Sequence, residues 1–437
     1  MRSEEVDLII KNCAILPMSR LGMVKEGLIA VKDGAVSYVG DAVSAPELRA
    51  ENVLEGKGKL AMPGLINCHT HLAMTLFRGL AEDATLKTWL SETIWPLEAK
   101  LRPQDVYAGS LLGCLEMIRN GVTCFADMYF YEHKVAEAVE KAGLRAVLAS
   151  GILEVSDWGR SEKMLKEAVG FAKRYRGYAD GRITTSLGPH TVFACSEELL
   201  VKVREKASQA DVGIHIHIAE SKEMAEKIGR ESSSSEVELL EKLGFLADDV
   251  LAAHCIHLTH EDMAILAKRG VKVVHNPVAN LKLAQGVAKV KELMDAGVTV
   301  GLGTDGAASN NSLDMFESMK VAALIQKAIS GDPSALPSKK VLEMATIRGA
   351  KALELEEKVG SLEVGKRADI ILIDLKKPNL TPLHDLCASL VYSAHGYDVD
   401  SVIVDGEVLM ENREVKTLDE EAVMEKAQDA AFSLLKR

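Results

Sequence analysis

The middle of the chain, from about residue 62 to residue 350, alternates short apolar runs with longer segments that have the periodicity of amphipathic helices. This alternation is typical of β-α-β units, in which helices cover a parallel sheet. Eight of the runs are long enough to form strands: 64–67, 122–126, 146–150, 183–187, 213–218, 250–253, 271–274 and 299–302. The period alone fits either an open doubly wound sheet or a closed (β/α)8 barrel.

Polar residues that can take part in chemistry follow nearly every one of these runs. They are His69, His71, Asp127, His190, His217, Glu220, His254, His275, Asn276 and Asp305. In an open sheet the first and last strands lie far apart, whereas a closed barrel brings all eight carboxyl ends to one rim. We therefore predict an α/β fold in which residues 62–358 form a TIM-like (β/α)8 catalytic barrel.

Both ends of the chain have the pattern of short strands joined by tight turns. Asp33-Gly34 separates two alternating runs, and Asp405-Gly406 follows the β-branched run 401–404. An Asp-Gly pair between such runs is a strong hairpin signal. Residues 1–61 and 359–437 are therefore predicted to form the two parts of one small β-sandwich domain. Within the barrel, the serine run 232–235 is predicted to be a loop and helix N-cap.

The composition excludes several classes of protein. A net charge of −12 without any basic run argues against binding to nucleic acid or to an anionic membrane surface. No run of about 18 apolar residues could span a bilayer, and the first residues lack the apolar stretch of a signal peptide. The seven cysteines are scattered without a C-x-x-C pair, which is typical of reduced thiols. We expect a cytoplasmic protein.

A metal site is indicated by His69 and His71, which are one residue apart. In an extended strand both imidazoles lie on the same face and can reach one cation. His217 ends the fifth run and Asp305 follows the eighth, so a closed barrel would bring all four residues together. Three imidazoles and one carboxylate suit Zn²⁺ with a position left for water, and Fe²⁺ or Mn²⁺ could replace it. The metal would lower the pKa of that water toward about 7, and Asp305 could accept its proton.

Other residues at the same rim have competing interpretations. We interpret His215 as a histidine that fills the barrel interior. Glu220 is either a proton shuttle next to the metal or an exposed loop carboxylate. His254 either hydrogen-bonds the hydroxide or a leaving group, or is a structural histidine at a strand end. The segment 187–190 contains no lysine that could be carboxylated to bridge two ions, so we predict one metal ion per chain.

Several motifs resemble the amidohydrolase superfamily: PGLINCHTH at 63–71, HNP at 275–277 and LGTDG at 302–306. Others are similar to the methylthioadenosine/S-adenosylhomocysteine deaminases and the archaeal 5′-deoxyadenosine deaminases: WPLE at 95–98, ADMYF at 126–130, NLKL at 280–283 and TDGAASNN at 304–311. The resemblance runs nearly end to end. It implies that the metal ligands are His69, His71, His217 and Asp305.

The same resemblance implies roles for other residues. Glu220 would protonate a purine ring nitrogen, and His254 would direct the hydroxide onto C6. Glu98 would accept hydrogen bonds from the ribose 2′- and 3′-hydroxyls, and His190 would contact the substrate. A carboxylate can accept from both hydroxyls of a cis-diol. Without the resemblance, Glu98 would be interpreted as a glutamate on a helix surface.

The chain departs from the family pattern at Ser150, where some homocysteine-accepting members have an arginine. Arg160 could replace that arginine in part. Losing a bidentate guanidinium weakens binding of an amino-acid carboxylate. We therefore expect small or uncharged 5′ substituents to be handled at least as well as S-adenosylhomocysteine.

The predicted reaction is hydrolytic deamination at C6 of adenine in 5′-modified adenosines, which gives the inosine analogue and ammonia. Candidate substrates are 5′-methylthioadenosine, S-adenosylhomocysteine, 5′-deoxyadenosine and adenosine. Two alternatives remain at this point: the same scaffold acting on guanine, cytosine or a chlorinated triazine, and a non-catalytic barrel stabilised by metal. The resemblance also implies a homo-oligomer.

Overall fold

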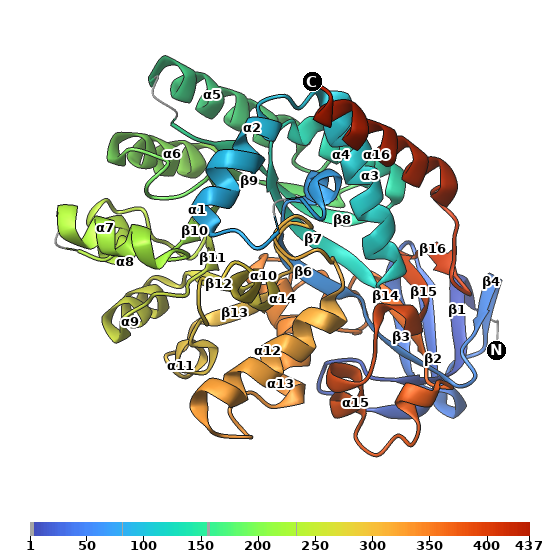
Figure 1. The fold of residues 1–437 in the computed structure, drawn as a ribbon. Helices are drawn as coiled ribbons and strands as arrows, with labels where there is room; N and C mark the ends of the chain where they lie inside the picture. The colour runs from blue at the N-terminus through green and yellow to red at the C-terminus, as the bar shows by residue number, and fades with distance from the viewer. Residues whose placement is uncertain (1–3, 81, 155–157, 233) are drawn as a thin grey trace.

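Eight parallel strands form a barrel in the computed structural model, which describes residues 4–80, 82–154, 158–232 and 234–437 (Figure 1). The strands follow one another in chain order around the barrel, and each is paired with the next. They are β6 (Leu65–Thr70), β7 (Val122–Tyr129), β8 (Arg145–Ile152), β9 (Ile183–Pro189), β10 (Gly213–Ile218), β11 (Val250–His254), β12 (Lys272–His275) and β13 (Thr299–Leu302). The predicted α/β barrel is confirmed, and each of the eight apolar runs is a strand.

The barrel is nearly closed between its first and last strands. No strand ladder joins β13 to β6 in the described part of the chain. Instead, the Asp305 backbone N–H donates to the His69 carbonyl at 2.9 Å. The Thr304 N–H donates to the Asn67 side-chain oxygen at 3.0 Å. These bonds hold the loop that follows β13 against the end of β6, and so place Asp305 beside the two histidines of that strand.

Helices cover the outside of the barrel (Figure 1). They are α3 (Pro103–Arg119), α4 (Glu132–Ala142), α5 (Trp158–Tyr175), α6 (Glu197–Ala210), α7 (Lys222–Ser232), α8 (Glu236–Lys242), α9 (His260–Arg269), α10 (Pro277–Lys282), α11 (Val290–Asp295), α12 (Met315–Ser330), α13 (Ser338–Met344) and α14 (Ile347–Ala352). In the serine run, Ser232 ends α7 and Ser235 caps α8, accepting from the Glu238 N–H. Ser233 lies outside the described residues.

The connection from β6 to α3 is long and contains several short helical segments. They are η2 (Leu72–Phe77), α1 (Leu86–Thr88), the π-helical turn η3 (Trp89–Ile94) and α2 (Trp95–Glu98). This connection contributes residues to the wall of the pocket at the carboxyl ends of the strands. Residues of this connection therefore lie at the same pocket as the ends of strands that are remote from them in sequence.

Both termini contribute to a second, mixed sheet of nine strands. Its order is β17-β16-β15-β14-β5-β1-β2-β3, with β4 paired to β1. The strands are β1 (Glu4–Ile15), β2 (Val24–Lys32), β3 (Ala35–Asp41), β4 (Leu48–Glu55), β5 (Lys59–Pro63), β14 (Ile370–Asp374), β15 (Val399–Val404), β16 (Glu407–Glu411) and β17 (Glu414–Val415). The antiparallel pairing of β5 with β14 joins the two ends of the chain, and both predicted Asp-Gly hairpins are present. The sheet is continuous, and the domain limits after residues 61 and 358 remain a prediction.

The terminal sheet is fastened to the barrel by a buried ion pair. Arg145, at the start of β8, binds Asp369 through two nitrogen–oxygen contacts of 2.8 and 2.9 Å. The side chains of Arg145 and Asp369 are only 3% and 2% exposed. The C-terminal helix α16 (Glu420–Leu435) leaves the sheet and packs on α3 (Figure 1). Helix α15 (Leu386–Tyr392) packs on α12 and α13. Among the described residues, no helix is both long and apolar enough to cross a membrane.

Candidate metal centre and active site

A pocket of about 690 Å³, partly open to solvent, lies at the rim where the barrel strands end. Polar residues at or just after the ends of β6, β9, β10, β11 and β13 line it: His71, His190, His217, Glu220, His254 and Asp305. Its wall is mostly apolar and comes largely from the connection between β6 and α3, with Met74, Leu86, Trp89, Leu90, Ile94 and Trp95. A mostly apolar pocket with a few convergent polar groups is the usual form of a small-molecule site.

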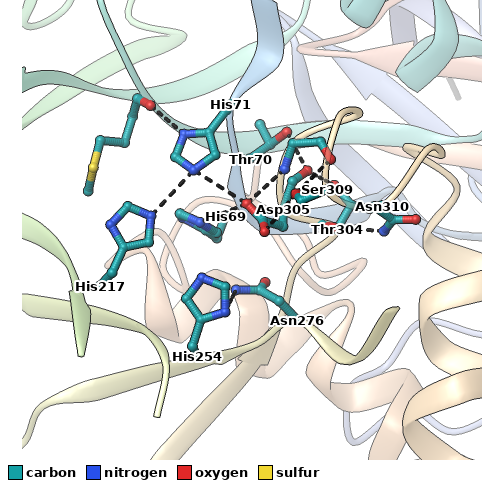
Figure 2. Close-up of polar contacts among 12 residues, drawn as sticks. His69, Thr70, His71, His217, His254, Asn276, Thr304, Asp305, Ser309 and Asn310 are labelled. Carbon is teal, nitrogen blue, oxygen red and sulfur yellow. Dashed lines mark hydrogen bonds and ion pairs between the residues drawn. The ribbon is translucent and has the colours of Figure 1, made fainter. Parts of the chain in front are cut away.

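Four histidines and one aspartate converge at the bottom of this pocket (Figure 2). Their ligand atoms form two overlapping groups, each with all atoms within 4.8 Å of one another. One group is His69, His71 and His217, and the other is His69, His254 and Asp305. The structure therefore brings together the four residues predicted as ligands and adds His254 beside them.

The distances within the cluster fit a single metal ion. Nε2 of His71 is 3.3 Å from Nε2 of His217. Oδ1 of Asp305 is 3.4 Å from Nε2 of His69 and 3.3 Å from Nε2 of His71. Ligands that bind zinc tetrahedrally at about 2.0–2.1 Å stand about 3.3 Å from one another. His69, His71, His217 and Asp305 can therefore hold one metal ion.

The charges of these groups suit a cation. Burial lowers the pKa of His69 to about 4 and that of His217 well below its usual value, so both rings are neutral at pH 7. Burial by itself raises the pKa of Asp305, but its hydrogen bond with His69 and the nearby His71 and His254 outweigh burial and lower the pKa. Neutral imidazoles and an ionised carboxylate are the forms that bind a metal.

The Asp305 carboxylate is held by its own loop. Oδ1 accepts from the Gly306 N–H and Oδ2 accepts from the Ser309 hydroxyl, both at 2.8 Å (Figure 2). The Thr70 hydroxyl donates to the Asp305 backbone carbonyl at 3.0 Å. Ser309 had no role predicted from the sequence, although it is part of the TDGAASNN motif on which the resemblance rests.

The turns after the strands aim side chains into the pocket at the expense of backbone strain. Ala219, His254 and Asp305 have φ values of 50°, 71° and 64°, in the left-handed region that favours glycine. Such residues cost about 1–3 kcal/mol each and cluster at functional sites. His254 is paired with Ile218 across the β10–β11 ladder, so regular alternation would point both side chains outward. The turn at His254 directs its ring into the pocket instead.

Glu220 and His254 lie next to each other at the pocket floor. The Glu220 side chain is 15% exposed, and its Oε1 is 3.9 Å from His254 Nε2. Burial raises the pKa of Glu220, and the neighbouring His254 opposes this. Nδ1 of His254 donates to Oδ1 of Asn280 at 2.7 Å, which leaves Nε2 facing the pocket. Asn280 had no role predicted from the sequence either, although it lies in the NLKL motif.

Glu98, His190 and Arg160 were also predicted to contact the substrate. Glu98 on α2 and His190 after β9 both line the pocket. Burial raises the pKa of Glu98 to about 7, while Tyr129 and His71 oppose this shift. Arg160 is exposed in the first turn of α5 and is not among the described residues that line the pocket. Ser150 is not in the lining either, but Gly151 and Leu153 of the same segment are.

Comparisons with known proteins agree with this geometry. The model of the amidohydrolase family matches residues 60–409. The 5′-deoxyadenosine deaminase of Methanosarcina acetivorans is 50% identical over 432 residues, which cover 99% of each chain. The 5-methylthioadenosine/S-adenosylhomocysteine deaminase of Moorella thermoacetica is 49% identical over 95% of this chain and 97% of that protein. The crystal structure of an adenosine deaminase from Xanthomonas campestris with bound zinc has a TM-score of 0.96 and 32% identity, covering 100% of both chains. This chain belongs to the amidohydrolase family.

Proposed function

We propose that the protein is a metal-dependent deaminase that hydrolyses the C6 amino group of adenine in 5′-modified adenosines. The products are the corresponding inosine analogue and ammonia. The observation that carries this proposal is the position of Glu220, a carboxyl group with a raised pKa, in the same pocket as His71, His217 and Asp305 of the metal-ligand cluster. The curated deaminases that are about half identical along the whole chain support the adenosine class over other rings.

In this proposal His69, His71, His217 and Asp305 hold one zinc ion. A bound zinc ion lowers the pKa of a water molecule toward about 7 and so provides a nucleophile at neutral pH. The zinc-containing relative from Xanthomonas campestris supports this choice of metal.

The chain's own residues orient the reactants and move protons. Asp305 accepts a proton from the attacking water, and Glu220 donates its proton to N1 of the purine ring. Since Nδ1 of His254 already donates to Asn280, its Nε2 accepts a hydrogen bond from the water and directs it toward C6. The C–O bond forms as the ring nitrogen is protonated. The C6–N bond then breaks as Asp305 passes its proton to the amino group, which leaves as ammonia, and the new C6 hydroxyl returns a proton to Glu220.

Glu98 is proposed to bind the ribose of the substrate. It lies on α2 with Trp89, Ile94 and Trp95 of the same connection also in the pocket wall. When ionised, its two oxygens can accept from the 2′- and 3′-hydroxyls together. His190 lines the pocket close to His217 and would contact the same substrate.

The charges in the pocket favour a substrate with an uncharged 5′ substituent. The described lining contains the carboxylates Glu98, Glu220 and Asp305 and no lysine or arginine. An amino-acid carboxylate would lose hydration here without gaining a cationic partner. We therefore propose 5′-deoxyadenosine and 5′-methylthioadenosine as better substrates than S-adenosylhomocysteine.

The test is to load the purified protein with zinc and measure ammonia release from these three nucleosides and adenosine. Guanine, cytosine and a chlorinated triazine serve as alternative substrates. We expect rapid turnover of the nucleosides and loss of activity with a chelator. Turnover of a free base or the triazine without turnover of any nucleoside would contradict the adenosine class and identify another ring as the substrate. Stoichiometric zinc without any turnover would indicate a non-catalytic barrel. The homo-oligomer implied by the family resemblance remains a proposal, which light scattering can test.

A further inference from the structure

The three histidines of the candidate metal centre each use the second ring nitrogen in a hydrogen bond. Nδ1 of His71 is 2.6 Å from the Met128 carbonyl oxygen, and Nδ1 of His217 is 2.7 Å from the His190 carbonyl oxygen. A carbonyl oxygen only accepts, so both Nδ1 atoms carry the proton and both Nε2 atoms are free to bind a cation. Such outer partners commonly set the tautomer and orientation of metal-binding histidines.

His69 is held differently. In the described structure the hydrogen-bond partner of its Nδ1 is another imidazole, with Nε2 of His215 at 2.8 Å. Both rings are buried, His69 at 0% and His215 at 1% exposure. An imidazole nitrogen can donate or accept, so this bond fixes the tautomer of His69 only in combination with that of His215. For Nε2 of His69 to bind a metal, Nε2 of His215 must be the acceptor.

The position of His215 explains why it can act on the metal centre without joining it. It lies on β10 two residues before His217, so both side chains face the barrel interior, and His215 is one layer deeper. Its neighbour across the β10–β11 ladder is Leu251. Nδ1 of His215 is buried and has no hydrogen-bond partner among the described residues. An unpaired buried polar group costs about 1–3 kcal/mol.

If His215 only filled space, an apolar side chain of similar size would fill the same volume without the cost of an unpaired, buried nitrogen. We propose that His215 is a positioning residue for the metal centre: its Nε2 accepts the Nδ1–H of His69 and thereby presents Nε2 of His69 to the metal. The inference revises the interpretation of His215 as a barrel-filling histidine, and it rests on the proposed metal-dependent function.

The experiment compares His215→Gln with His215→Met in the full-length protein. The two replacements have the same length, but only glutamine offers an acceptor near the position of Nε2. The zinc dissociation constant is measured by competition with a chromophoric chelator, and the thermal unfolding of the metal-free proteins is measured beside it. Since outer partners of metal ligands typically contribute about 10–100-fold in affinity, we expect a loss of that size for His215→Met and substantial recovery for His215→Gln. The metal-free variants should unfold at similar temperatures.

His275→Met is the matched control, because it removes a buried histidine of β12, two strands away from β10, whose ring makes no hydrogen bond to a candidate ligand among the described residues. Its zinc affinity should stay close to that of the unmodified protein. If His215→Met folds poorly, His215→Phe is used as the apolar variant instead, because phenylalanine keeps a ring of similar shape without an acceptor. Unchanged zinc affinity in the apolar variant, or equal losses for glutamine and the apolar variant, would overturn the inference. Failure of the unmodified protein to bind zinc would instead overturn the proposed function.

Discussion

Replacing Glu220 with glutamine tests the proposed proton donor most directly. Glutamine keeps the size of the side chain and can still hydrogen-bond, but it has no carboxylic acid proton to give. The structure makes Glu220 suitable as an acid, because burial raises the pKa of its carboxyl group and keeps part of it protonated closer to neutral pH. His254, whose Nε2 lies 3.9 Å from Oε1 of Glu220, limits this shift.

The expected effect is a fall in kcat with the metal retained. A positioned general acid contributes about 10²–10⁴-fold to a rate, which corresponds to about 3–5 kcal/mol of transition-state stabilisation. Glu220 is outside both groups of closely spaced ligand atoms, so the zinc content of Glu220→Gln should stay at one ion per chain. The KM should change little, because the lost interaction belongs to the transition state.

The assay is steady-state ammonia release from 5′-deoxyadenosine together with elemental analysis of the same preparations. Glu236→Gln is the matched control. Glu236 is also a buried carboxyl, with its pKa raised to about 7, but it accepts from the Ala219 N–H and does not line the pocket. Glutamine can still accept that bond, so its kcat should remain near normal. A near-normal kcat for Glu220→Gln, or a fall that merely follows loss of zinc, would refute the assigned role.

Three further measurements follow from the same geometry. Because burial raises the pKa of Glu98 to about 7, its ionised form, which accepts hydrogen bonds, is lost as pH falls. The KM for nucleosides should therefore decrease as pH rises from about 6 to about 8. A Glu98→Gln variant that keeps this pH dependence would count against Glu98 as the residue that binds the ribose. The kcat/KM for S-adenosylhomocysteine should be below that for 5′-methylthioadenosine at every pH tested, and the reverse order would contradict the electrostatic argument. Arg145→Met removes the guanidinium that pairs with the buried Asp369 carboxylate, so the free energy of unfolding in urea should fall by about 3–5 kcal/mol. A fall below about 1 kcal/mol would show that the ion pair is dispensable.

The strands of the barrel could be predicted from the sequence because parallel strands covered on both faces are continuous apolar runs. The ends of some strands could not. The second run was predicted to stop at Ala126, but β7 continues to Tyr129, and β8 continues beyond Ser150 to Ile152. In both cases the extra residues, 127–129 and 151–152, pair with the neighbouring strand, which supplies their backbone partners. Such pairing is a property of the assembled sheet and has no local signal.

Glu98 shows a second limit of the sequence. Its position in the WPLE motif carried a resemblance, but the residue pattern around it fits a glutamate on the surface of a helix equally well. Its pKa is raised because the connection between β6 and α3 folds over the barrel rim and shields the carboxyl group. A carboxylate can be recognised as half-buried only when the path of that connection is known, and local periodicity does not contain it.

The resemblance predicted a role for His254, but the orientation of its ring required the structure. Strand alternation correctly predicts that His69 and His217, which lie on β6 and β10, face the barrel interior, and His71, the residue that follows β6, joins them there. Applied to β11, the same rule would direct His254 outward with its ladder partner Ile218. The left-handed turn at His254 overrides the rule, and it is held by the Asn280 side chain and by the Cys255 N–H, which donates to the Ile218 carbonyl at 2.9 Å. A non-glycine residue adopts this conformation only where tertiary contacts compensate for the strain. The inward orientation of His254 therefore depends on these contacts with other parts of the chain, which strand alternation does not contain.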